Sequence, residues 1–513
     1  MPSSRRSSTS SDQSFKSGRS RPSIANESTA ALVLIHDPED SESPFEFSDE
    51  DEDYEPLDAQ HRSASSVSAL SPSTVFVYLL APYLSLGALI LPGTVVPLKY
   101  GLGALILFAV LSAFVRQIWY MLARYMRNLS MEEVIVDALA RGRGKENRRS
   151  VLRGLIRLGT GFLRVVLAAM YLRDAADNLP QMVLIPHVPT RPILIVVVAL
   201  GVLPLSLANS WSAKRIVWST WASVAMYVLW LGSVSYAYAH GILEVKPQSD
   251  NLWEGITIIA FAFTSASTLP LYASLKGSAP LVTTKTKNSH SFKLLSILSV
   301  SVGALLILPL VFFSALPNQP VSETAAVDPN ALISTLAALT LALRIPSIIV
   351  TAPAIPLPLS VRRSTTSAFQ HGLARGLIWA LVLLLGLGTS LGSAGTRFSR
   401  LLSDVGLLAA LSSTYILPAI IHIITHHLKR PLSIVIPSTP LTSNVSRGHS
   451  PTSPSAPPSA PSPYDELLQR KELALQRRRL GRRIIWDVGV WVVLVPVGGG
   501  GAIWCAGRAF GQW

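Results

Sequence analysis

The sequence predicts an all-helical integral membrane protein with about eleven membrane-spanning segments. Hydrophobic residues make up 49% of the 513 residues and charged residues only 14%, against roughly a quarter in soluble proteins. The acidic residues are concentrated near the N-terminus, so that 16 of the 30 follow residue 60. Beyond residue 73 the chain is dominated by apolar runs of about 18–28 residues, each long enough to cross a bilayer as a helix.

Changes in composition divide the chain into four regions. Residues 1–73 are polar and acidic with few apolar side chains, which predicts a disordered cytosolic tail. Residues 74–424 form the predicted transmembrane core, 425–483 a Pro/Ser-rich and basic cytosolic linker, and 484–513 the last span with a short C-terminus. The predicted spans are 74–97, 101–122, 153–179, 191–209, 214–238, 252–275, 292–315, 331–358, 373–392, 402–424 and 484–510.

The distribution of Lys and Arg predicts the orientation of the chain. Loops that follow even-numbered spans contain 27 of these residues, whereas loops after odd-numbered spans, together with the C-terminus, contain six. Because basic residues in short loops are retained on the cytosolic side, the N-terminus is predicted to be cytosolic. The net charge of +14 therefore indicates orientation in a bilayer, and we expect no nucleic-acid partner.

Two spans contain residues that disfavour a continuous helix. In the first span Pro82 and Pro92 flank Ser85 and Gly87, and in the sixth span the stretch 264–268 is small or hydroxylated and leads to a proline. Inside a membrane, unpaired backbone is tolerated only around a cavity or binding site. Interruptions five spans apart are typical of an inverted pair of five-helix repeats, with simple kinks in two helices as the alternative.

Short motifs occur along the chain in the order known from one transporter family. The stretch 86–92, Leu-Gly-Ala-Leu-Ile-Leu-Pro, is similar to that family's first-span pattern Gly-x-Gly-Ile-Leu-x-Leu-Pro. Further similar stretches are 130–133, 171–180, 203–207, 259–263, 346–353 and 405–418. The chain thus resembles the amino acid/auxin permease family, also called the transmembrane amino acid transporter family, which has the LeuT-type fold. It departs from the pattern at Ser85 and at Thr264-Ser265, beside the implied substrate.

The resemblance implies a secondary active transporter of amino acids that works by alternating access. Broken first and sixth spans would meet near mid-membrane, where N–H groups after Gly87 receive the substrate carboxylate and carbonyls around Phe263 to Ala266 accept its ammonium. The implied substrate-binding residues are Ser85, Leu86, Gly87, Ala88, Phe263, Thr264, Ser265 and Ser267. Coupling to H⁺ or Na⁺ is also implied, and the candidate ion-coupling residues are Ser347, Thr351 and Asp177.

The sequence predicts neither an enzyme nor a bound metal or cofactor. Its single cysteine, Cys505, excludes an intrachain disulfide and a cysteine-based zinc site. The stretch 388–392 matches the Gly-x-Ser-x-Gly hydrolase motif, but it lies in an apolar span, where small residues allow close helix packing. His422 and His426 have the helical spacing of a metal pair, yet no carboxylate adjoins them in sequence, so we expect interfacial histidines.

Partners and location are predicted from position and short motifs. The bilayer and an amino acid are the expected partners, with sorting adaptors as candidates because Tyr54 and Tyr464 each begin a tyrosine-based sorting pattern on the cytosolic side. The expected location is the vacuolar or lysosomal membrane or the plasma membrane. The alternative function is a non-transporting amino acid sensor or receptor-like protein with the same fold, which the long tail and the unusual site residues favour.

Glycosylation tests the predicted topology. The sequons at Asn26, Asn128 and Asn444 all fall on the predicted cytosolic side, where N-linked glycans are not added. We therefore expect the full-length protein to keep its electrophoretic mobility after enzymatic deglycosylation. A glycan at Asn444 would contradict the topology.

Overall fold

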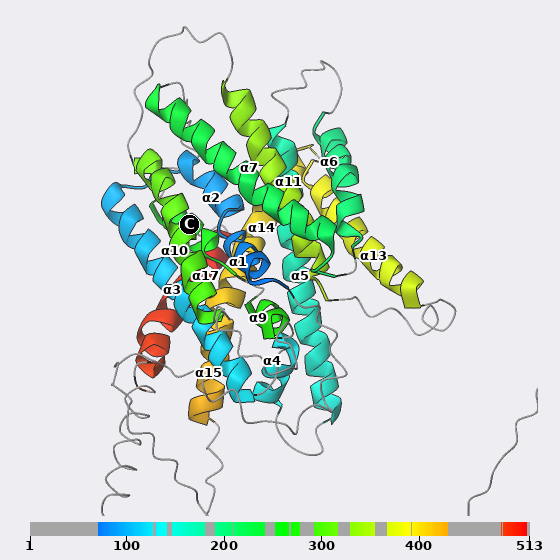
Figure 1. The fold of residues 1–513 in the computed structure, drawn as a ribbon, viewed down its shortest axis with the longest axis vertical. Coiled ribbons are helices and arrows are strands. Elements are labelled where there is room, and N and C mark those ends of the chain that lie inside the picture. Colours follow the sequence, from blue (N-terminus) through cyan, green and yellow to red (C-terminus); the bar gives the residue numbers. More distant parts are fainter. Residues whose placement is uncertain are drawn as a thin grey trace, which may run out of the picture. The chain divides into compact units, whose positions relative to one another are not determined.

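Residues 70–126, 130–140, 146–179, 190–208, 210–241, 252–265, 268–276, 292–315, 329–353, 367–390, 392–428, 484 and 486–509 are described by the computed structural model. Within these ranges the chain forms helices joined by turns and bends, without a β-strand (Figure 1). The predicted all-helical class is thereby confirmed. The acidic tail and the Tyr54 and Tyr464 motifs lie outside the described residues.

The described helices are named as in Figure 1. They are α1 (Pro72–Leu80), α2 (Leu86–Ile90), η3 (Leu91–Gly93), α3 (Leu98–Met126), α4 (Met131–Leu139), α5 (Glu146–Asn178), α6 (Thr190–Ser206), α7 (Lys214–Ala239), α8 (Leu252–Ala262), α9 (Thr268–Lys276), α10 (Phe292–Ala315), α11 (Pro329–Val350), α13 (Ser367–Gly388), α14 (Gly392–Leu411), η5 (Ser412–Ile416), α15 (Leu417–Ile423), η6 (Ile424–Leu428), η7 (Gly489–Leu494) and α17 (Val495–Ala509). Helix α1 begins two residues before the predicted boundary at 73/74, and the helical run α14 to η6 extends to Leu428, into the predicted linker.

Seven helical stretches among the described residues are long and apolar enough to cross a membrane. They are Leu98–Ala123, Glu146–Asn178, Lys214–Ala239, Phe292–Ala315, Ala331–Val350, Gly395–His426 and Trp486–Arg508. Three shorter apolar helices cover Arg191–Ser206, Leu252–Ala262 and Ala374–Gly388. The chain is therefore a helical protein of multi-pass membrane character, with helices in all eleven predicted spans and membrane-crossing length in seven.

The first predicted span is divided into two helices. Ser71 caps α1, its side chain accepting a hydrogen bond from the Thr74 backbone N–H at 3.4 Å. The helix ends at Leu80, and Pro82 follows in the turn, where its missing N–H cannot continue the helical ladder. The chain is extended at Ser85, with φ −127° and ψ −153°, before α2 begins at Leu86.

The sixth predicted span is divided in the same way. Helix α8 ends at Ala262, and α9 begins at Thr268. The end of α8 is tightened because the Thr264 backbone N–H donates to the Phe261 carbonyl at 3.0 Å, three residues back. Two of the five linking residues, Ala266 and Ser267, lie outside the described part of the chain.

The two divided spans pack against each other through backbone. A side-chain Cβ at Gly87 of α2 would lie 2.7 Å from the backbone N and Cα atoms of Ala262, at the end of α8. Only glycine permits this approach, because both opposing atoms belong to backbone and cannot rotate away. Gly87 therefore sets the distance between the two interruptions.

Buried hydrophobic side chains form two clusters in the described helices. The first consists mainly of residues from α1, α3, α8, α9 and α10, joined by parts of α7, α15 and η7. The second consists mainly of residues from α5, α6, α11 and α13. Each cluster thus combines predicted spans that lie five apart in the sequence. The first cluster pairs span 1 with span 6 and span 2 with span 7, and the second pairs span 3 with span 8 and span 4 with span 9.

The glycine contact yields a test of the fold. We expect Gly87→Ala to lower the free energy of unfolding by about 1–3 kcal/mol, because the added methyl group overpacks a backbone contact. Gly103→Ala is the matched control, since a Cβ there meets no atom within 4 Å. Thermal denaturation of the purified proteins in detergent measures both; equal midpoints for the two variants would show that the two backbones are not in close contact.

Candidate functional site

A cavity of about 80 Å³ lies where the divided spans meet the second cluster. On the scale where one water needs about 10–15 Å³, this is room for on the order of five to eight waters. It is bounded by α1 and the following turn, α5, the end of α8, α11, and the α14–η5 region. Its polar lining consists of Tyr78, Arg164, Tyr171, Thr264, Arg344, Ser347, Thr351, Ser413 and Thr414. We refer to it as the central cavity.

A second cavity of about 300 Å³ adjoins the central cavity. It lies among α3, α4, α5, α9 and the end of α14, and its lining is mostly apolar. Leu163, Arg164 and Ser413 line both cavities. The larger space, which we call the vestibule, therefore leads from the helix α4 toward the central cavity.

Two tyrosines fix the divided first span beside the central cavity. The Tyr171 hydroxyl of α5 donates to Ser85 Oγ at 2.8 Å, and Ser85 Oγ donates in turn to the Pro82 carbonyl at 2.5 Å. The Tyr78 hydroxyl donates to the Trp211 carbonyl at 2.9 Å. The interruption of the first span is thus held by hydrogen bonds to two other parts of the bundle.

Several hydroxyl groups in the cavity wall donate hydrogen bonds to nearby backbone carbonyls. Thr264 Oγ1 donates to the Phe261 carbonyl at 2.8 Å, Ser347 Oγ to the Arg344 carbonyl at 2.8 Å, and Thr351 Oγ1 to the Ile348 carbonyl at 2.6 Å. Hydroxyls on membrane helices commonly bond back to their own helix in this manner. The oxygen lone pairs that are left can accept hydrogen bonds from a ligand.

A buried arginine donates a hydrogen bond to the backbone carbonyl that is set free at the interruption of the first span. Arg116 of α3 is 1% exposed and donates from Nη2 to the Leu79 carbonyl at 2.7 Å. That carbonyl is free because the Tyr83 backbone N–H bonds to Leu80 instead. The guanidinium also donates to Ser299 Oγ at 2.7 Å and to Ser265 Oγ at 3.4 Å. Arg116 therefore links α3, α10 and both interruptions.

A tyrosine serves the same purpose at the second interruption. The Tyr415 hydroxyl donates to the Ala260 carbonyl of α8 at 3.2 Å, and Tyr415 is fully buried. The Phe261 carbonyl accepts from both the N–H and the hydroxyl of Thr264. The carbonyls of Ala260 and Phe261, just before the interruption, are thus bonded within the protein, and the role of the carbonyls from Phe263 onward in binding an ammonium stays a prediction.

The structure separates the predicted site residues into three groups. Thr264, Ser347 and Thr351 line the central cavity, and Ser265 lines the vestibule. The other described candidates are buried in the packing around the interruptions, where Gly87 contacts α8 rather than the cavity; they are Ser85, Leu86, Gly87, Ala88 and Phe263. Ser267 lies outside the described residues. Their roles in binding stay predictions.

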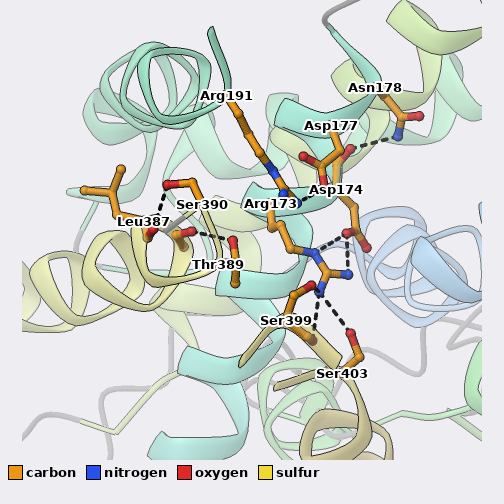
Figure 2. A network of polar contacts seen from close by, with 11 residues as sticks. Arg173, Asp174, Asp177, Asn178, Arg191, Leu387, Thr389, Ser390, Ser399 and Ser403 are labelled. Carbon is orange, nitrogen blue, oxygen red and sulfur yellow. Dashed lines mark hydrogen bonds and ion pairs between the residues drawn. The ribbon is translucent and has the colours of Figure 1, made fainter. Parts of the chain in front are cut away.

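Asp177, the third candidate for ion coupling, lies away from the cavity at the end of α5. Its Oδ2 pairs with Arg191 Nη2 at 2.6 Å, and both side chains are more than a third exposed. Figure 2 shows this pair beside a second one, in which Arg173 binds Asp174 and donates to Ser399 and Ser403 of α14. These carboxylates have arginine partners, as expected for acidic residues near span ends.

Two further ion-pair groups lie outside the cavity. Arg508 of α17 contacts Glu254 of α8 at 3.1 Å and Asp404 of α14 at 3.2 Å, and so bridges three helices. At the other end of these spans, His422 Nε2 lies 3.1 Å from Asp487 Oδ1. The histidine that was expected at the interface is thus buried against a carboxylate, because Asp487, distant in sequence, folds back onto it. Among the described residues, no three His, Cys, Asp or Glu side chains gather to bind a metal ion.

The arginines within the spans are the site residues that the sequence analysis missed. Arg116, Arg164 and Arg344 lie in the second, third and eighth predicted spans, and Arg164 and Arg344 line the central cavity. A charged side chain within a membrane helix is a functional candidate by default. Their position inside apolar spans is the sequence signal that identifies these three arginines.

Comparison with known proteins gives no match to this chain. No protein-family model matches the sequence, and no curated protein matches it. The resemblance to the amino acid/auxin permease family therefore stays a prediction from the sequence motifs.

The Arg508 bridge gives a prediction that the single cysteine can report. Cys505 is 1% exposed and lies one helical turn before Arg508. We expect Arg508→Gln to raise the rate of maleimide labelling of Cys505 roughly tenfold, because losing both ion pairs loosens the local helix contacts by over 1 kcal/mol. Arg397→Gln, at an exposed arginine of α14, is the control. An unchanged labelling rate in Arg508→Gln would contradict a stabilising bridge.

Proposed function

We propose that the protein is a secondary active transporter of amino acids with a LeuT-like arrangement of eleven spans. The observation that carries this proposal is the grouping of the helices. Spans one, two, six and seven pack in one cluster and spans three, four, eight and nine in another, and the central cavity lies between them. Inverted repeats whose two halves rock around a fixed site require this pairing of spans five apart.

The proposed orientation makes the vestibule cytosolic. The basic loops that flank α4 lie on the cytosolic side by the distribution of Lys and Arg, and α4 borders the vestibule. On the opposite side, Arg508 joins α8 to α14, and Arg173 joins α5 to α14. The described conformation therefore fits an inward-facing state. In such a state the cytosolic path is the wider one, and the contacts of Arg508 and Arg173 close the outer side.

Protons are the proposed coupling ions, with Na⁺ as the second candidate. The Arg116 guanidinium already occupies the oxygen-rich position between the two interruptions, where Leu79, Ser265 and Ser299 supply its acceptors. A second cation beside it would be repelled. Ser347 and Thr351 retain lone pairs toward the cavity and are the remaining candidates for a Na⁺ site.

The proposed location follows from the same orientation. The N-terminal tail and the linker face the cytosol, and the protein resides in a vacuolar or lysosomal membrane or in the plasma membrane. Sorting adaptors that bind the Tyr54 or Tyr464 patterns would decide between these membranes.

Uptake by proteoliposomes tests the proposal. We expect the purified full-length protein to concentrate radiolabelled amino acids under an imposed pH gradient more than under a Na⁺ gradient. Thr264→Phe should abolish uptake because the ring fills the central cavity, whereas Ser301→Phe, at an exposed position of α10, should leave it intact. Saturable amino acid binding without flux would instead identify a sensor, and neither binding nor flux of any amino acid would refute the proposal.

A further inference from the structure

The positive charge of the central cavity is not balanced by carboxylates in its lining. Arg164 and Arg344 both line it, and no aspartate or glutamate lines either the cavity or the vestibule among the described residues. Arg116 adds a third guanidinium behind Ser265 of the vestibule wall, without a carboxylate partner among the described residues. Uncompensated charge in a water-poor interior costs several kcal/mol, so a ligand of opposite charge would be bound strongly there.

This cost of an uncompensated charge is greatest for Arg344. It lies within a membrane-crossing helix, α11, six residues before its end at Val350, and is 7% exposed. Its buried Nη1 has no hydrogen-bond partner in the described part of the chain. A buried guanidinium with an unused donor at a cavity wall can bind a carboxylate through a charge-assisted hydrogen bond.

The cavity wall offers acceptors as well as donors. Ser347 stands on the same helix as Arg344, Thr351 directly follows that helix, and Thr264 lies just after α8. Each hydroxyl donates to a nearby backbone carbonyl and leaves lone pairs for a ligand. Such oxygens suit an ammonium group. Donors for carboxylates and acceptors for one ammonium thus line a single space.

We infer that the substrate is an acidic amino acid, with a net charge of minus one. The inference rests on the proposed function and names the substrate class of that same cavity. Arg344 binds one carboxylate of the substrate, Arg164 binds the other from the boundary with the vestibule, and the hydroxyl oxygens accept hydrogen bonds from the ammonium. A neutral amino acid would leave one of the two arginines without an anion.

A comparison of glutamate with glutamine tests the effect of substrate charge, because the two amino acids have nearly the same size. We expect the wild-type protein in proteoliposomes to take up L-glutamate or L-aspartate at least about 30-fold more efficiently than the corresponding amide. This ratio corresponds to one charge-assisted pair between guanidinium and carboxylate. Arg344→Met should abolish the preference, and Arg344→Lys should retain part of it, because lysine keeps the charge but loses the planar fork.

Controls keep a loss of folding apart from a loss of selectivity. Arg148→Met removes an exposed arginine from the first turn of α5 and should keep the wild-type ratio. For each variant, the thermal midpoint in detergent is measured with and without 10 mM glutamate or glutamine. Glutamate should raise the midpoint of the wild type and of Arg148→Met, and no longer that of Arg344→Met.

The possible outcomes distinguish this inference from the proposed function. Uptake of neutral or basic amino acids in preference to acidic ones would overturn the inference and leave the transporter proposal standing. An unchanged ratio of glutamate to glutamine in a folded Arg344→Met variant would also overturn it. If no amino acid is bound or transported, both the inference and the proposed function are refuted.

Discussion

Two helices are interrupted inside the bundle, and the backbone groups set free there must find partners, since the bilayer interior offers no water to bind them. The Leu79 carbonyl receives the guanidinium of Arg116, and the Ala260 carbonyl receives the hydroxyl of Tyr415. Both donors come from other spans. The interruptions are therefore stable only inside the assembled bundle, and the close contact between Gly87 and Ala262 holds them at one level.

The same interruptions connect two groups of helices that pack separately. The first hydrophobic cluster contains the divided spans, and the second contains α5, α6, α11 and α13. Polar links between them include the hydrogen bond from Tyr171 to Ser85 at the first interruption and the bond from Ser223 of α7 to the Thr340 carbonyl of α11. Such links can break and re-form at modest cost, whereas the clusters themselves stay packed. This division is what a rocking transporter needs.

Charge is distributed unevenly between the rim and the interior of the bundle. Aspartates near the helix ends have basic partners, as in the pairs Asp177–Arg191 and Asp487–His422. The interior holds guanidinium groups and hydroxyls, and its described lining has no carboxylate. In the proposed transporter, this distribution of charge would direct anionic substrates toward the cavity, and their binding would stabilise the bundle.

The sequence alone determined the all-helical, multi-pass membrane character and the places of the two interruptions, because hydrophobic length and proline act locally. It also indicated Thr264, Ser347 and Thr351, which line the cavity. Only the tertiary structure decided that Gly87 serves helix packing, and that Asp177 is paired at the rim. It also decided that Arg164 and Arg344 meet at the cavity, since residues from spans three and eight become neighbours only when the helices pack.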